Sequence, residues 1–149
     1  MSNYESTIWE KLPVVEVIQP QSITAGATGV LTGAIDMQKY SRVTAILLSG
    51  TLGASGTLDL SATASDASGG TYAALSGKAI TQMVKATNDN DVAILEVDAG
   101  DVAAVSKRYV KFKAVAGTAA ATSALVVLGI PRNYDADLVE FANVVEKVD

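Results

Sequence analysis

Cysteine and histidine are both absent from the 149 residues of this chain. Without cysteine the chain can form neither a disulfide nor a thiolate metal site. Without histidine it lacks the commonest general base and the commonest zinc ligand of proteins. The usual catalytic triads, which need histidine beside serine or cysteine, therefore cannot be assembled. We expect a protein that is not an enzyme and that binds no metal or other cofactor.

Aromatic residues and positive charge are also scarce. Aromatic side chains make up 5% of the chain, with one tryptophan and two phenylalanines, which leaves little from which to build a surface that stacks on sugars. The net charge of −5 disfavours a nucleic-acid partner, because neutralising phosphates requires a basic surface. No motif indicates a small-molecule substrate.

Long apolar runs are missing as well. The longest, at residues 125–128, is far shorter than the roughly 20 residues that a membrane-spanning helix needs. Residues 1–12 have neither the basic nor the apolar segment of a secretory signal. We therefore expect synthesis in a cytoplasm and no membrane partner. The 149 residues fit one domain, since domains typically have about 100 to 200 residues.

The most strongly patterned stretch is KRYVKFKAVAGTAAATSALVVLGI, at residues 107–130. In its first half, Val110 and Phe112 begin an apolar series that alternates with lysines and a tyrosine, which is typical of a half-buried strand. In its second half, residues 125–128 are apolar on both sides, as in a strand that is covered on both faces. We predict two strands joined as a hairpin by a Gly-Thr turn at residues 117–118, at the centre of an all-β domain.

Six further short strands are predicted ahead of this stretch. Eight short strands at a spacing of roughly ten residues, without a long helix between them, are typical of a sandwich or barrel. Eight antiparallel strands in two sheets make a jelly roll, which is the predicted architecture. An immunoglobulin-like sandwich is the alternative. The six upstream strands are expected at residues 12–19, 30–37, 42–49, 57–64, 78–84 and 92–97.

Three of these strands carry positional signals. Prolines at both ends of residues 12–19 place that strand at a sheet edge. In residues 30–37, Leu31 is expected to face the core, and Gly33 permits a bulge. Residues 42–49 are apolar on both sides, so we place this strand in the middle of a sheet.

Two short segments fall outside the strand pattern, which covers residues 12–131. Residues 1–11 contain the single tryptophan, Trp9, next to Ile8. Because tryptophan is enriched at interface hot spots, these two residues are candidates for anchoring an N-terminal arm on a neighbouring molecule. The alternative is a loose terminal tail. The other segment is residues 132–149.

The C-terminal segment has an apolar side that needs a covering surface. In residues 132–149, Leu138, Phe141 and Val145 fit one face of a helix, while Phe141 and Val145 fit a strand almost as well. We predict an arm or short helix here. Its apolar side would be covered by its own domain or by another chain.

Lys107, Arg108, Lys111 and Lys113 form the one basic cluster of the sequence. The first interpretation is a charged outer face that keeps a strand solvated and prevents edge pairing. The alternative is electrostatic docking onto an acidic protein shell. A single tyrosine among these residues does not make a nucleic-acid stacking surface.

Acidic turns offer a further candidate, a calcium site. Asp89, Asn90 and Asp91, or Asp98 with Asp101, could supply oxygen ligands. The glycine and distal glutamate of a calcium-binding loop are missing, however, so turn formation explains these residues better. We expect Asp98 or Asp101 to cap one helical turn.

Several strand and turn residues together form a recognisable set: Asp36, the YSRVT run at residues 40–44, the Gly-Thr turn at 50–51, the loop at 98–105, KRYVK at 107–111 and LVVL at 125–128. This set resembles the small β-rich structural proteins of tailed bacteriophages, in particular capsid decoration, or cement, proteins. The likeness spans residues 12–131.

The resemblance implies a jelly-roll-like domain that forms homotrimers, binds the major capsid protein on the capsid surface of the virion, and stabilises the shell. It also implies arms that reach across capsomer boundaries. Two alternatives remain open. One is another phage structural component, a tail-tube or head-completion protein. The other is a carbohydrate- or receptor-binding β-sandwich, which would need exposed aromatic side chains in a cleft.

Overall fold

The computed structural model describes residues 8–26 and 28–132. Within them, the helices are short: α1 (Ile8–Lys11), α2 (Lys85–Asn88) and α3 (Ala99–Ala103). The long strands are β1 (Val14–Ile23), β4 (Tyr40–Leu52), β5 (Thr57–Ser65), β6 (Ala73–Ala79), β8 (Val92–Asp98), β9 (Tyr109–Gly117) and β10 (Ala121–Pro131). Three strands have two residues each, namely β2 (Val30–Leu31), β3 (Ile35–Asp36) and β7 (Met83–Val84).

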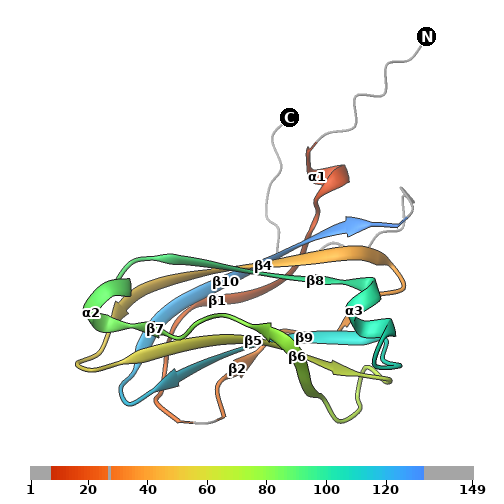
Figure 1. The fold of residues 1–149 in the computed structure, drawn as a ribbon. Helices are drawn as coiled ribbons and strands as arrows, with labels where there is room; N and C mark the ends of the chain where they lie inside the picture. The colour runs from red at the N-terminus through yellow and green to blue at the C-terminus, as the bar shows by residue number, and fades with distance from the viewer. Residues whose placement is uncertain (1–7, 27, 133–149) are drawn as a thin grey trace.

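The strands form two antiparallel sheets that lie one above the other in Figure 1. Sheet A has the order β1-β10-β4-β8. Sheet B has the order β2-β9-β5-β6, with β3 also paired to β9 and β7 also paired to β5. The prediction of an all-β sandwich is confirmed.

The chain passes between the sheets at nearly every step. It runs through β1 in sheet A, β2 and β3 in B, β4 in A, β5 to β7 in B, β8 in A, β9 in B and β10 in A. Because β2 and β3 share one place beside β9, and β6 and β7 share one place beside β5, the ten strands fill eight places. This winding is that of a jelly roll. The count of ten strands instead of eight reflects two interrupted strands.

Strands β9 and β10 do not form the predicted hairpin. Strand β9 pairs with β5 in sheet B, whereas β10 lies between β1 and β4 in sheet A. The residues between them form a corner that carries the chain from one sheet to the other (Figure 1). The predicted pairing of β9 with β10 was wrong because alternation of apolar and polar residues shows which side of a strand is buried, but not which strands lie next to it. Each strand is nonetheless central in its own sheet.

The core lies between the two sheets. Leu60 and Phe112 from sheet B, and Leu47, Leu125 and Val127 from sheet A, are fully buried there. Their sequence neighbours point to the outer faces, because successive residues of a strand point to opposite sides. The alternation seen in β5 and β9 therefore identified the core-facing residues correctly.

The second predicted strand is divided around Gly33. The backbone N–H of Gly33 donates to Oε2 of Glu16 at 3.2 Å, and a Cβ on Gly33 would overlap that carboxylate. The interruption changes the phase of the strand, so Thr32 is buried and Leu31 is 42% exposed. The expectation that Leu31 faces the core was wrong.

Other local predictions can be compared directly. Strand β1 lies at the edge of sheet A, as predicted, and Pro20 falls at one of its two register shifts, where a missing N–H is tolerated. Strand β4 is central, also as predicted. The strand expected at residues 78–84 was misplaced, because β6 and β7 leave residues 80–82 between them. The helical turn capped by Asp98 is confirmed as α3.

Candidate functional site

The carboxylates of the acidic turns accept hydrogen bonds from backbone N–H groups of the domain. Asp89 Oδ1 accepts the N–H of Leu52 at 2.8 Å, and its other oxygen pairs with Lys85 Nζ, which lowers the pKa of Asp89. Asp101 Oδ2 accepts the N–H of Asp98 at 2.8 Å. Among residues 8–26 and 28–132, no group of three or more acidic side chains is placed to hold a metal ion. These carboxylates therefore shape turns and helix ends.

The helices of the described part are short. The longest, α3, has five residues. None in residues 8–26 and 28–132 is long and apolar enough to cross a membrane.

The basic cluster is divided by the fold. Arg108 precedes β9 and binds Asp36 of β3, with Nη2 to Oδ2 at 2.7 Å. This hydrogen bond holds the pKa of Asp36 below its usual value, whereas burial alone would raise that pKa. The guanidinium also lies 5.0 Å from the ring centroid of Tyr109. Arg108 is thus committed to an internal ion pair and is a poor choice for docking.

The lysines of β9 lie on the outer face of sheet B, where Lys111 and Lys113 are half-buried. Lys111 Nζ is 4.5 Å from the ring centroid of Tyr72. Lys111 also acts electrostatically on Glu16: burial raises the pKa of this carboxyl group, and the Gly33 N–H and the charge of Lys111 partly lower it again. The lysines occupy the outer face as predicted, but β9 is a central strand, so they do not protect a sheet edge, and that part of the interpretation was wrong. Docking through Lys107, Lys111 and Lys113 stays a prediction.

The predicted arms lie mostly beyond the described part of the chain. Ile8 begins α1 and is 80% exposed. Trp9 is the next residue of that helix. Leu138, Phe141 and Val145 lie outside the described residues. Whether these five residues bind another molecule stays a prediction.

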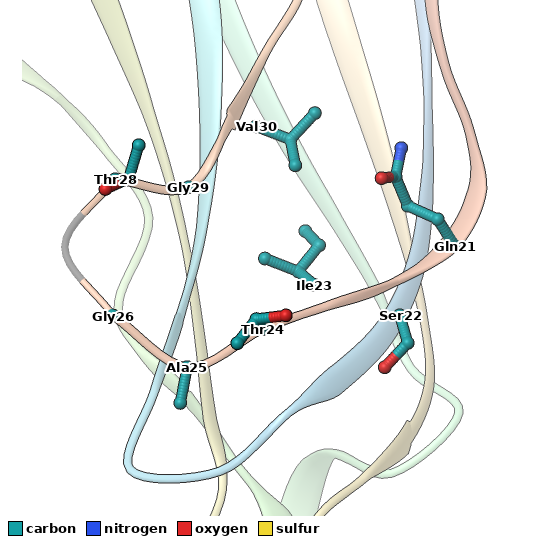
Figure 2. A pocket seen from close by; sticks show the side chains of 9 residues that line it. All are labelled: Gln21, Ser22, Ile23, Thr24, Ala25, Gly26, Thr28, Gly29 and Val30. Atoms are coloured by element: carbon teal, nitrogen blue, oxygen red, sulfur yellow. The ribbon is translucent and has the colours of Figure 1, made fainter.

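A shallow depression lies at the corner between β1 and β2 (Figure 2), lined by residues 21–26 and 28–30. Ile23 and Val30 point toward one another across it in Figure 2. The lining residues include no ionisable and no aromatic side chain. The depression therefore offers neither acid-base chemistry nor a platform for stacking on a sugar.

The outer face of sheet A carries an apolar area that the sequence reasoning missed. The strand register aligns Val126, Ile46 and Ile94 in one row, and Leu48 and Val92 in the next row. We call these five residues the apolar outer face. Ile94 is 63% exposed, Val92 57% and Leu48 42%. Single exposed apolar residues are ordinary, but a contiguous group of this kind is a candidate for an interaction site.

The other end of the same face is charged. Arg42 on β4 binds Asp98 and lies 3.5 Å from Glu96, both on β8. Thr44 also donates to Glu96, at 3.1 Å. Sheet A thus presents an apolar half and a salt-bridged half to the outside, and the apolar half is the better candidate for binding another protein.

No family model matches the chain, and no curated protein matches its sequence. The function must therefore be argued from the surfaces themselves. The signal for the apolar outer face was present in the sequence, because Val92 and Ile94 share a side with the charged Glu96 on the strand predicted at residues 92–97. What was missing was the register that puts them beside Ile46 and Leu48.

Proposed function

We propose that this protein is a structural component of a tailed-bacteriophage virion that binds the outside of the capsid shell and stabilises it. The resemblance of residues 12–131 to capsid decoration proteins supports this proposal. The jelly-roll winding of the two sheets agrees with that resemblance. The partner would be the major capsid protein, and the binding unit a homotrimer.

The single observation that carries the proposal is the apolar outer face. Ile94, Val92 and Leu48 are exposed on a face that has a regular, paired backbone beneath it. Burying apolar surface contributes about 25 cal/mol per Å² before the costs of association are subtracted. An exposed apolar sheet face suits attachment to another protein better than it suits chemistry on a small molecule.

The mechanism is mechanical. A decoration protein adds contact area between neighbouring shell subunits, so the shell resists the internal pressure of packaged DNA. Three copies held together would convert weak single contacts into strong attachment, because the second and third contacts form at high effective concentration. Arm residues such as Ile8 and Trp9 would extend the contact.

The decisive experiment is addition of purified protein to expanded heads that lack decoration. We expect stoichiometric binding. Leu48→Glu should weaken it at least about tenfold, because a charge would then be buried in an apolar contact. Leu31→Glu is the matched control, since Leu31 on sheet B has the same exposure of 42% and lies away from sheet A.

The arms are tested in the same assay. Deleting residues 1–11, or replacing Trp9 by Ala, should cost about 2 kcal/mol or more of shell binding if Trp9 is a hot spot. Unchanged occupancy would remove the arm from the proposal. Failure of the intact protein to bind any shell, together with binding to a glycan, would overturn the proposed function.

A phage tail-tube or head-completion protein is the second candidate. It is separated from the first by mass in solution, since a stable trimer favours decoration, whereas a ring-forming or polymerising species favours a tail or neck position.

A further inference from the structure

Strand β8 is the most regular sheet edge in the described part of the chain. The opposite edge of sheet A, β1, has two register shifts, and both edges of sheet B are interrupted strands. In contrast, β8 pairs with β4 over seven residues without a register shift, and no described strand pairs with its other side. Such an edge is a template for pairing with another chain unless it is covered.

Side chains cover one half of this edge. Lys78 Nζ donates to the carbonyl oxygen of Glu96 at 3.1 Å, and Asp101 Oδ2 accepts the N–H of Asp98 at 2.8 Å. These two backbone groups therefore point away from β4, toward the open side. Lys78 Nζ and Asp101 Oδ2 also form an ion pair at 2.7 Å, so the two side chains that cover this half of the edge are bound to each other.

Among residues 8–26 and 28–132, no side chain covers the other half of the edge in this way. In an antiparallel ladder the backbone groups of alternate residues point to the same side of the strand. Because those of Glu96 and Asp98 point to the open side, those of Ile94 and Val92 do so as well. Val92 and Ile94 are 57% and 63% exposed, and their side chains are apolar. The open half of the edge is therefore apolar and ready to form hydrogen bonds.

We propose that this open half of β8 pairs with the same segment of a second copy of this chain, in antiparallel fashion, about a twofold axis through Ala93. In this register Val92 of each copy lies opposite Ile94 of the other. These are hydrogen-bonded pairs, each of which exchanges two N–H···O bonds. The two copies of sheet A become one continuous sheet.

The backbone groups of β8 that are already bonded to side chains decide which partner and which register remain possible. A twofold axis through Leu95 would put Ile94 opposite Glu96, whose carbonyl is already bonded to Lys78. The axis through Ala93 uses only Val92 and Ile94, so the open groups of β8 are complementary to themselves. Across the junction the side chains of Val92 and Ile94 from both copies form cross-strand apolar pairs. They continue the apolar outer face of each copy.

This inference goes beyond the proposed function, because the pairing requires a second copy and no shell. A contact through two residues of each strand is short, so it should form and dissociate with protein concentration. On a decorated surface it would join neighbouring trimers across local twofold axes, where effective concentration is high.

The test introduces a cysteine at Ala93. In the proposed register the two copies of residue 93 form a non-hydrogen-bonded pair with Cα atoms about 4.5 Å apart, which lies within the range of disulfides. The natural chain has no cysteine, so any disulfide must come from the introduced residue. Under mild oxidation Ala93→Cys should become mostly a covalent dimer. The control Ser76→Cys, at an exposed position on the edge strand β6 of sheet B, should form dimers at least tenfold more slowly.

A second measurement does not depend on that variant. Sedimentation of the natural chain should show the mass of the basic unit doubling as concentration rises. Ile94→Lys should abolish the doubling, and Leu31→Lys should preserve it. Equal cross-linking at residues 93 and 76, or a mass that Ile94→Lys leaves unchanged, would overturn the inference. If Ile94→Lys reduces shell binding while Ala93→Cys does not cross-link, the edge binds the shell, and self-pairing is wrong.

Discussion

Arg108 forms an ion pair with Asp36 at the end of the paired strands β3 and β9, where Asp36 lies opposite Tyr109. Nε of Arg108 donates to Oδ1 of Asp36 at 3.0 Å, and Nη2 donates to Oδ2 at 2.7 Å. Such two-pronged pairing is the strong form of an ion pair, because the planar guanidinium matches the geometry of the carboxylate. The two residues are 72 positions apart in the chain. Their contact ties the short strand β3 to the start of β9.

Replacing Asp36 by Asn tests this ion pair. At neutral pH we expect the free energy of unfolding to fall by about 1 kcal/mol. This is less than the loss expected for a buried charged hydrogen bond, because Arg108 is partly exposed. Arg108 lowers the pKa of Asp36 below its ordinary value of 3.8. The stabilisation is therefore complete above the ordinary value and is lost as the pH falls through the lower folded-state value.

Urea denaturation at several pH values checks both statements. The natural protein and Asp36→Asn should differ at pH 7 and converge in acid. A difference that stays constant down to the lowest pH would mean that ionisation of Asp36 does not contribute.

The contact between Lys111 and Tyr72 should stabilise the fold in addition to solvating sheet B. Lys111→Gln and Tyr72→Leu are each expected to lower the free energy of unfolding, with a coupling of about 0.5 to 1 kcal/mol, because the ammonium lies over the ring face. A double-mutant cycle measures that coupling. Additive effects of the two substitutions would show that the cation–π contact contributes nothing.

Gly129 marks a close approach between β10 and its neighbours. A Cβ there would lie 2.6 Å from Cδ1 of Tyr40 and 2.7 Å from Cγ2 of Val15. Gly129→Ala should therefore destabilise the protein by about 1 to 3 kcal/mol through overpacking. Gly100→Ala is the matched control, because it adds the same methyl group in α3 with no atom within 4 Å. It should stabilise by about 0.5 to 1 kcal/mol. Thermal unfolding of both variants distinguishes the two effects.

Lys78 should protect the β8 edge from pairing with another chain. Lys78→Ala uncovers the carbonyl of Glu96 and should cost under about 1 kcal/mol of stability, as expected for an ion pair near the surface. It should nevertheless increase self-association, because the open edge becomes longer. Light scattering against Lys39→Ala, an exposed lysine in the turn before β4, provides the comparison. An unchanged scattering profile would contradict this protective role.

The strands themselves were largely predictable from the sequence. Alternation in residues 57–64 and 107–117 marks Leu60 and Phe112 as core residues, and both are fully buried. Apolarity on both sides placed β4 and β10 in central positions. Prolines placed β1 at an edge. These signals are local, since each depends on which face of one strand is buried.

Errors arose where a distant residue changed the local pattern. Gly33 interrupts the second strand because Glu16, from another sheet, occupies the space beside it. This shifts the phase, so Leu31 is exposed and Thr32 buried. Arg108 appeared to belong to a basic surface cluster, but Asp36 binds it. No spacing rule reveals contacts between residues so far apart in the chain.

The sequence by itself determined that this is an all-β chain, which faces of its strands are apolar, and that histidine and cysteine chemistry is excluded. Only the tertiary structure decided that β9 and β10 lie in different sheets, that Val92 and Ile94 join Ile46 and Leu48 in one apolar area, and that the described part of the chain leaves half of the β8 edge open. The physical reason is that side-chain periodicity encodes burial of a single strand, whereas pairing, register and edges are properties of the whole sheet.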